Sequence, residues 1–227
     1  MTLYLLDTNE LKNPELFQRA LATVDGKRRK KVESYLFGKD QRLSLGAGLL
    51  LAYFMKQHEI PEKDMVISET GKPEVSPSFS LYFNVSHAGE FVLFCSGSHP
   101  LGIDIEQIQP DYLSIAETFF TREERAEIFA KETLHQQEET FFRLWTLKES
   151  YMKATGLGFL LPLHTFSVII KEGEATFLTP QNANQEFRLQ EVEAPIGYTA
   201  SVCVSAKYQG ALPRTPTMIE VEKLVSF

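Results

Sequence analysis

Two segments near the middle of the chain place acidic side chains on defined faces of regular structure. Asp104 and Glu106 are two residues apart in a strand-like run, so both carboxylates point to one face. Glu149 and Lys153 are four apart in a helical run, so they share a helix face. Converging carboxylates repel one another unless a cation lies between them. The pattern predicts a divalent metal ion on oxygen ligands, with a lysine beside it to hold an anion.

Each of these motifs also has a plainer interpretation. An isolated Asp-x-Glu is more often part of a half-exposed strand whose acids are solvated. Here Ile103 and Ile105 alternate with the acids, as expected for a strand with one polar face. Glu149 and Lys153 could instead form an exposed salt bridge, which would stabilise the helix little.

The helix expected over residues 136–155 favours the site over the salt bridge. Its broad apolar stripe is made by Phe141, Leu144, Trp145, Leu147, Tyr151 and Met152. Glu149 lies at the edge of this stripe and Lys148 lies near its middle. Charged groups in such positions have to be paired or bound, because burying them alone is costly.

Charge and composition limit the possible partners. The formal net charge is -7, so the chain as a whole does not attract polyanions, and a phosphate site needs a local basic patch. The unbroken basic run at residues 27–31 is most often a solvated helix face. It leaves nucleic-acid binding open, although no aromatic residues interleave with it. Cys95 and Cys203 lie in apolar runs and are expected to be buried free thiols.

Nothing in the sequence is typical of a membrane protein. Residues 1–7 lack a basic region and are broken by Asp7, so we expect a first strand there, not a signal peptide. The longest apolar run, residues 45–55, is too short to cross a bilayer. We expect a soluble, cytoplasmic protein with no membrane partner.

The order of expected elements predicts an α+β fold with antiparallel sheets. Helices are expected over residues 14–36 (weakened at Gly26), 40–58, 112–131 (capped by Thr121) and 136–155, with a short one at 218–225. Strands are expected at residues 1–7, 65–68, 81–86, 91–96, 101–105, 166–171, 175–178, 187–191 and 198–204. Helices followed by strands, twice, indicate two similar halves, residues 1–105 and 106–227.

Two short motifs could contribute polar groups to a site. Gly71 and Pro73 fix a turn that projects Lys72, although most such turns are only surface loops. Ser86 and His87 end a strand and could donate hydrogen bonds to a phosphate. The flanking sequence does not support a serine nucleophile, because no Gly-x-Ser-x-Gly surrounds it.

Taken in order, these motifs resemble the Sfp-type 4′-phosphopantetheinyl transferases, and the resemblance runs nearly from end to end. The residues that carry it are the basic helix, Gly71 to Pro73, Phe83 to His87, Gly102 to Glu106, Phe119 with Phe120, Trp145 to Lys153, and Pro162 to Phe166. The resemblance implies two pseudo-twofold-related α+β halves, each an antiparallel sheet packed with helices, with the site in the cleft between them. It also implies Mg²⁺-dependent transfer of phosphopantetheine from coenzyme A to a carrier-protein serine, releasing 3′,5′-ADP, as in a holo-[acyl-carrier-protein] synthase.

The resemblance also implies a role for each site residue. Mg²⁺, with Mn²⁺ as a substitute, is expected on Asp104, Glu106 and Glu149, and Glu149 is expected to accept the serine proton. Lys153 is expected to hold a pyrophosphate oxygen. His87 is expected to be catalytic, as are Glu149 and Lys153. The N-terminal half is expected to bind the nucleotide end of coenzyme A, through Lys27, Lys30, Lys31, Arg42, Lys72, Ser86 and His87. Leu43 stands where some members carry a hydroxyl, which removes one possible nucleotide contact.

The expected partner is an acyl or peptidyl carrier protein, which would dock near residues 115–128, where Phe119 and Phe120 precede a helix. The enzyme is expected to act as a monomer and to bind no nucleic acid. Two other functions stay open on the residues alone. One is a Mg²⁺-dependent phosphohydrolase that uses the same acids, and the other is a nucleic-acid-binding module that uses residues 27–31.

Overall fold

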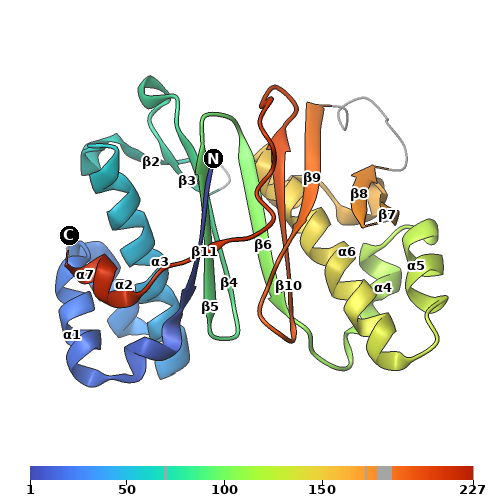
Figure 1. Cartoon of the computed structure of the whole chain (residues 1–227), viewed down its shortest axis with the longest axis horizontal. Helices are drawn as coiled ribbons and strands as arrows, with labels where there is room; N and C mark the ends of the chain where they lie inside the picture. The colour runs from blue at the N-terminus through green and yellow to red at the C-terminus, as the bar shows by residue number, and fades with distance from the viewer. Residues whose placement is uncertain (69–70, 172, 178–185, 227) are drawn as a thin grey trace.

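The computed structural model describes residues 1–68, 71–171, 173–177 and 186–226, and it confirms the α+β class. Two sheets lie side by side at its centre, with helices at both ends (Figure 1). One sheet has the order β11-β1-β5-β4, formed by Thr217–Met218, Thr2–Asp7, Phe91–Gly97 and Tyr82–Ala88. The other has the order β6-β10-β9, formed by Leu101–Gln107, Tyr198–Ser205 and Phe187–Val192.

The helices at the N-terminal end are α1 (Pro14–Thr23), α2 (Gly26–Ser34) and α3 (Gly38–Gln57). The single helix expected over residues 14–36 is therefore wrong, because the chain breaks at Val24 and Asp25. Asp25 caps α2, since its carboxylate accepts from the backbone N–H of Lys27 at 2.7 Å and of Arg28 at 2.9 Å. The cap starts a new helix axis and turns the basic run onto a short helix of its own.

At the other end, the expected helix over residues 112–131 divides in the same way. It consists of a 3₁₀ turn (Tyr112–Ile115), α4 (Ala116–Phe119) and α5 (Arg122–Phe129). Thr121 starts α5 as expected, through a capping box with Glu124. The long helix α6 (Leu134–Thr155) ends at Gly156, whose φ of 74° is the left-handed conformation that glycine adopts readily.

Two small hairpins and several 3₁₀ turns complete the fold. The hairpins are β2 (Met65–Ile67) with β3 (Pro73–Val75), and β7 (Val168–Lys171) with β8 (Glu174–Phe177). The sequence did not predict β3, and Leu178 of the expected strand 175–178 lies outside the described residues. The remaining 3₁₀ turns are Thr8–Lys12, Glu62–Asp64, Pro77–Phe79, Gly158–Leu160 and Leu163–Thr165. No helix of the described part is long and apolar enough to cross a membrane, and a cytoplasmic location stays a prediction.

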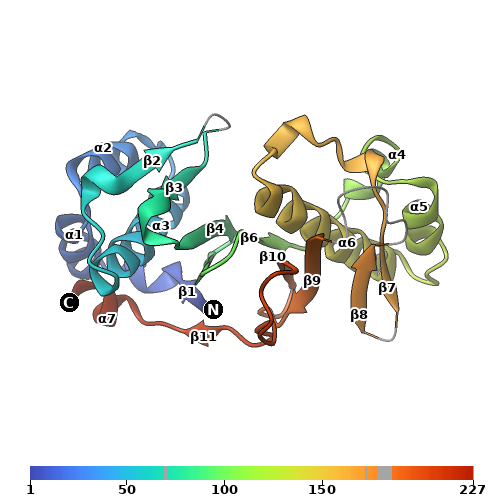
Figure 2. The same ribbon diagram turned by 90° about the horizontal axis from the view of Figure 1, so that it is seen from above.

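The C-terminal segment returns to the N-terminal sheet. β11 pairs in parallel with β1, and α7 (Val221–Val225) packs beside α1 and α3, so that the chain ends next to its first helices (Figure 2). The backbone N–H of Val221 donates to Glu10 at 3.0 Å, and Arg19 pairs with Glu222 at 2.8 Å. A boundary between residues 105 and 106 would pass through β6, which pairs along its length with β10. The division into two functional halves stays a prediction.

Candidate active site

Three elements bring polar side chains together where the two sheets meet. Asp104 on β6 is 2% exposed, and its Oδ1 accepts from Nζ of Lys153 on α6 at 2.6 Å and from Oγ of Ser86 on β4 at 2.8 Å. Lys153 also donates to Ser86 Oγ at 3.1 Å. Asn84 joins the strands nearby, since its Oδ1 accepts from the Ile103 backbone N–H at 2.8 Å. Residues from both sheets and from α6 therefore form one connected polar group.

Glycine at position 102 allows α6 to lie this close to β6. A Cβ atom there would be 2.2 Å from the Ser150 carbonyl oxygen and 2.4 Å from the Ala154 nitrogen. Both are backbone atoms of α6, so they cannot move aside as a flexible side chain would. This close approach brings the helix face that carries Glu149 and Lys153 against the strand that carries Asp104 and Glu106.

The three predicted metal-binding acids interact electrostatically. Burial raises the pKa of Glu106 to about 7, and repulsion from Asp104 and Glu149 adds to the rise against the attraction of Lys153. Burial also raises the pKa of Glu149, with Asp104 contributing. Burial opposes the charge on Lys153, but the attraction of Asp104, Glu149 and Glu106 raises its pKa overall. Lys153 pairs with Asp104, and not in the exposed salt bridge to Glu149 that was the plainer interpretation.

The donor set fits a hard cation. Asp104 Oδ2 is buried and has no hydrogen-bond partner. Burial and repulsion disfavour the ionised forms of the neighbouring Glu106 and Glu149. All of these donors are oxygens, which suit Mg²⁺ or Mn²⁺. Within the described ranges, no group of three acidic, histidine or cysteine side chains is already arranged to hold an ion. The metal site therefore stays a prediction.

Lys72 and His87 lie beside this group. Lys72 Nζ donates to the carbonyl oxygens of Lys153 at 2.8 Å and of Leu101 at 3.4 Å, so it ties the β2–β3 hairpin to α6 and β6. Burial lowers the pKa of Lys72. Burial also lowers the pKa of His87, and the positive charges of Lys153 and Lys31 lower it further. Lys31 is thus close enough to His87 to connect the basic helix electrostatically with the polar group.

The other predicted nucleotide-binding residues lie on α2 and α3. Lys27 and Lys30 are exposed on α2. Arg42 on α3 is not free, because it pairs with Glu90 at 3.1 Å. Sequence reasoning did not identify Glu90, which lies in the β4–β5 turn three residues after His87. Its proximity to a motif residue was the available signal, but the pair with Arg42 spans 48 residues and depends on the fold.

The predicted docking aromatics are more buried than expected. Phe120 is 2% exposed and packs edge-to-face on Phe141 at 5.0 Å, so it belongs to the core. Phe119 is partly buried against Trp145 at 5.2 Å. Two aromatics near this region are exposed, Tyr112 at 41% and Phe129 at 49%. Phe129 lines an open groove together with Leu113, Ser114, Glu117, Arg122, Arg125 and Ala126.

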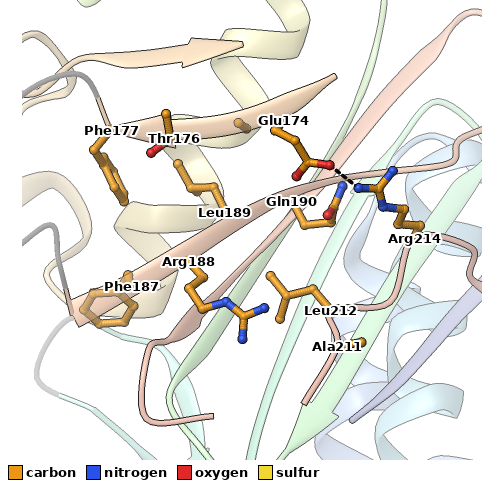
Figure 3. Close-up of a pocket in the computed structure, with 11 residues that line it drawn as sticks. Glu174, Thr176, Phe177, Phe187, Arg188, Leu189, Gln190, Ala211, Leu212 and Arg214 are labelled. Carbon is orange, nitrogen blue, oxygen red and sulfur yellow. Dashed lines mark hydrogen bonds and ion pairs between the residues drawn. The ribbon is translucent and has the colours of Figure 1, made fainter. Parts of the chain in front are cut away.

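A separate cavity of about 440 Å³ lies between β8, β9 and the segment before β11 (Figure 3). Glu174 and Arg214 form an ion pair at one side of it, and Arg188 donates to the carbonyl oxygens of Tyr208 and Gly210. None of the predicted site residues lines this cavity or the groove at Phe129. The polar group around Asp104 is therefore distinct from both.

Comparisons with known proteins agree with the motifs. Residues 12–99 match the family "4'-phosphopantetheinyl transferase, N-terminal", and residues 100–204 match the "4'-phosphopantetheinyl transferase superfamily". The chain is 31% identical to the 4'-phosphopantetheinyl transferase ffp of Bacillus subtilis, over 99% of this chain and 100% of that one. It is 30% identical to Sfp of Bacillus subtilis strain 168, over 92% of each chain. It is 32% identical to gsp of Aneurinibacillus migulanus, over 98% of this chain and 92% of that one.

These matches cover nearly the whole of both chains, and they include the segments that form the polar group. Neither a phosphohydrolase nor a nucleic-acid-binding module is supported by them. The resemblance drawn from the motifs is confirmed. The chain belongs to the 4′-phosphopantetheinyl transferase family, and it is an enzyme that transfers phosphopantetheine.

Proposed function

We propose that the donor is coenzyme A, that the acceptor is a serine of a carrier protein, and that the reaction requires Mg²⁺ at Asp104, Glu106 and Glu149. The observation that carries the proposal is the meeting of Asp104, Lys153 and Ser86 beside two carboxylates of raised pKa. A bound Mg²⁺ would supply positive charge that neutralises the pyrophosphate and the leaving nucleotide. Mn²⁺ offers the same oxygen preference and is expected to substitute.

The chain's own residues then have separable roles. The carrier serine oxygen bonds to the phosphorus that bears pantetheine, and the bond from that phosphorus to the leaving 3′,5′-ADP breaks. Glu149 takes the serine proton, directly or through a water molecule. The Lys153 ammonium, now on Asp104, turns to a pyrophosphate oxygen. The lowered pKa of His87 favours the neutral imidazole, which offers a hydrogen bond without repelling the nearby lysines.

The N-terminal half would bind the nucleotide end of coenzyme A. Lys27, Lys30 and Lys31 put positive charge on α2, and the charge of Lys31 reaches His87. Arg42 would exchange Glu90 for a phosphate, and Lys72 with Ser86 would contact the same end of the ligand. The overall negative charge of the chain makes this local basic surface necessary for binding a polyanion.

The test of the function is mass spectrometry of a panel of apo carrier proteins incubated with the enzyme, coenzyme A and Mg²⁺. The expected result is a phosphopantetheine adduct on the carrier serine, with 3′,5′-ADP released in equal amount. Hydrolysis of coenzyme A in the absence of any carrier would instead support a phosphohydrolase. A carrier panel that stays unmodified while coenzyme A is stable would refute the proposed donor and acceptor.

The 3′-phosphate of coenzyme A is expected to bind Lys27 and Lys30. Dephospho-coenzyme A should therefore show a higher KM, and Lys27→Ala or Lys30→Ala should remove part of the difference. A charge-assisted contact of ~1.5–3 kcal/mol corresponds to roughly 10–150-fold, and exposure on α2 favours the lower end. The control is Lys171→Ala, which removes the same charge from β7. Equal KM values for both ligands in the unaltered enzyme would remove this contact from the proposal.

We propose that the carrier docks at the groove lined by Phe129, Arg122 and Arg125, and not on Phe120, which is core. Phe129→Ala is expected to raise the carrier KM about 5-fold or more, as for a buried interface aromatic, and to spare the KM for coenzyme A. Because carrier domains are usually acidic, like this chain, modest salt should leave the carrier KM unchanged or lower it.

Met218→Ala is the matched control for this change, because Met218 is 58% exposed but lies on β11. A carrier KM that rises steeply with salt would show that Arg122 and Arg125 govern docking, in place of apolar contact.

A further inference from the structure

A buried ion pair lies inside the C-terminal half, on the side of α6 that faces α5. Lys148 and Glu124 are both 0% exposed, and Lys148 Nζ lies 2.6 Å from each carboxylate oxygen of Glu124. The same ammonium donates to the Phe166 carbonyl oxygen at 2.6 Å and lies 4.4 Å from the centre of the Phe166 ring. This pair provides the partner that the position of Lys148 in the apolar stripe required.

The pair is the centre of a polar network that joins three segments. Glu124 on α5 also accepts from the backbone N–H of Thr121 at 2.9 Å and of Val168 at 2.8 Å. Ser167 donates to the Thr121 hydroxyl at 2.8 Å. The Thr121 N–H bond closes the N-cap of α5 itself, whereas the others link α5 or its N-cap to α6 and to the start of β7. All of these groups lie among core aromatics, so the network has few alternative partners.

Apolar contacts alone would hold these segments together without fixing their direction. Side chains of similar volume could fill the same space and let α5 rotate or slide on α6, because packing is not directional. Replacing buried ion pairs by apolar residues is often neutral for stability, so stability alone does not account for the pair. What the network adds is a defined orientation of α5, since hydrogen bonds depend on distance and angle.

The network lies between the active-site residue Glu149 and the groove proposed for carrier docking. The reaction requires a fixed distance and orientation between these two sites. Lys148 directly precedes Glu149 on α6, and Glu124 lies on the helix whose outer residues Arg122, Arg125 and Phe129 line the groove. We propose that Lys148 and Glu124 are positioning residues, which set the carrier-docking helix α5 relative to Glu149 so that the carrier serine reaches the phosphorus. This inference rests on the proposed function. It adds that the pair governs the use of the carrier and leaves coenzyme A binding alone.

The test uses the full-length enzyme with three altered forms. Lys148→Met leaves Glu124 buried without its partner, and that change alone is expected to destabilise the fold. The double variant Glu124→Gln/Lys148→Met removes both charges, and its glutamine amide oxygen still accepts from a backbone N–H of Thr121 or Val168, so it is the deciding variant. The control is Arg143→Met/Glu191→Gln, which removes an ion pair of 2.7 Å between the same helix and β9. That pair makes no hydrogen bond to α5, and its two charges act on Glu127 of α5 in opposite directions, so removing both together largely cancels at α5.

The double variant is expected to lose a few degrees of Tm, because one backbone N–H loses its acceptor, and to keep a near-normal KM for coenzyme A. Its carrier kcat/KM should fall ~10–100-fold, as expected for a misplacement of about 1 Å. Backbone amides of Arg122–Phe129 should exchange hydrogen faster, whereas those of α1 and α3 should not. The Arg143→Met/Glu191→Gln control should match the unaltered enzyme in both measurements.

A double variant with normal carrier kcat/KM and unchanged exchange in α5 would overturn the inference, because the pair would then be structural only. Equal losses for the carrier and for coenzyme A binding would also overturn it, since the effect would not be specific to docking. The exchange measurement needs no carrier, so it decides whether the pair orients α5 even if the panel of carriers stays unmodified. Failure of that panel with the unaltered enzyme would count against the proposed function.

Discussion

Replacing Asp104 by Asn, or Glu149 by Gln, is expected to remove most of kcat and to leave the enzyme folded. Both changes keep side-chain volume and remove one negative charge from the proposed metal-binding group. Charge stabilisation by a bound metal is worth several kcal/mol, and each 1.36 kcal/mol is tenfold in rate, so we expect losses of at least ~100-fold. EDTA should abolish activity in the unaltered enzyme, and Mg²⁺ or Mn²⁺ should restore it. Activity is measured by carrier mass, and metal binding by calorimetry.

The matched control is Glu139→Gln, which lies on α6 with Glu149 but ten residues earlier. It should keep normal kcat and normal metal affinity. The two site variants should bind Mg²⁺ more weakly and keep the circular dichroism of the unaltered protein. Near-normal turnover in both variants, or full activity in EDTA, would show that these carboxylates do not hold a required metal ion.

The alternation and helical spacing of the sequence were sufficient to predict the two elements that build this site. Ile103 and Ile105 are both fully buried, as a strand with one polar face requires, and β6 spans the expected residues. The stripe on α6 correctly placed Lys148 where a partner was needed. These successes have one physical cause: strand and helix periodicities are local, so each segment contains the information that determines its own faces.

The exact pairing of the side chains is not local, and sequence reasoning did not find it, although it did place Asp104 and Lys153 in one site. Asp104 and Lys153 are 49 residues apart, and Lys72 is 81 residues from the carbonyl oxygen of Lys153 that it binds. The return of β11 to β1 joins still more distant segments. Such pairs follow from the tertiary arrangement, which one sequence does not specify by pattern. The same limit explains why Phe120 was interpreted as a docking residue, although its contacts with Phe141 and Trp145 make it core.

The predicted helix boundaries were wrong for a different reason. At these positions the chain can either continue one helix or cap a new one. Asp25 and Thr121 each satisfy backbone N–H groups of the helix that follows, and each interrupts a run that was expected to be continuous. Thr121 was recognised as a cap, but the break before it was not. A capping residue inside a helical run can end one helix and start the next. The chain breaks in this way before α2 and before α5.

Gly102→Ala is expected to have a large effect on stability and on activity together. The added methyl group would lie 2.2 Å from the Ser150 carbonyl oxygen and 2.4 Å from the Ala154 nitrogen. Because both are backbone atoms, α6 has to move away from β6, and overpacking of this kind costs about 1–3 kcal/mol or more. In a chain of this size that lowers Tm by roughly 2–12 °C. A shift of about 1 Å at Glu149 and Lys153 should also lower kcat up to ~100-fold.

Gly26→Ala is the matched control, because a Cβ atom at Gly26 would meet nothing within 4 Å. The two variants are compared by thermal unfolding and by carrier modification at a temperature well below either Tm. Loss of Tm without loss of kcat would show that α6 relaxes away from β6 at its C-terminal end and leaves Glu149 in place. Unchanged Tm and kcat in Gly102→Ala would mean that helix and strand do not approach as closely as these distances require, and the arrangement of Asp104, Lys153 and Ser86 would then need another support.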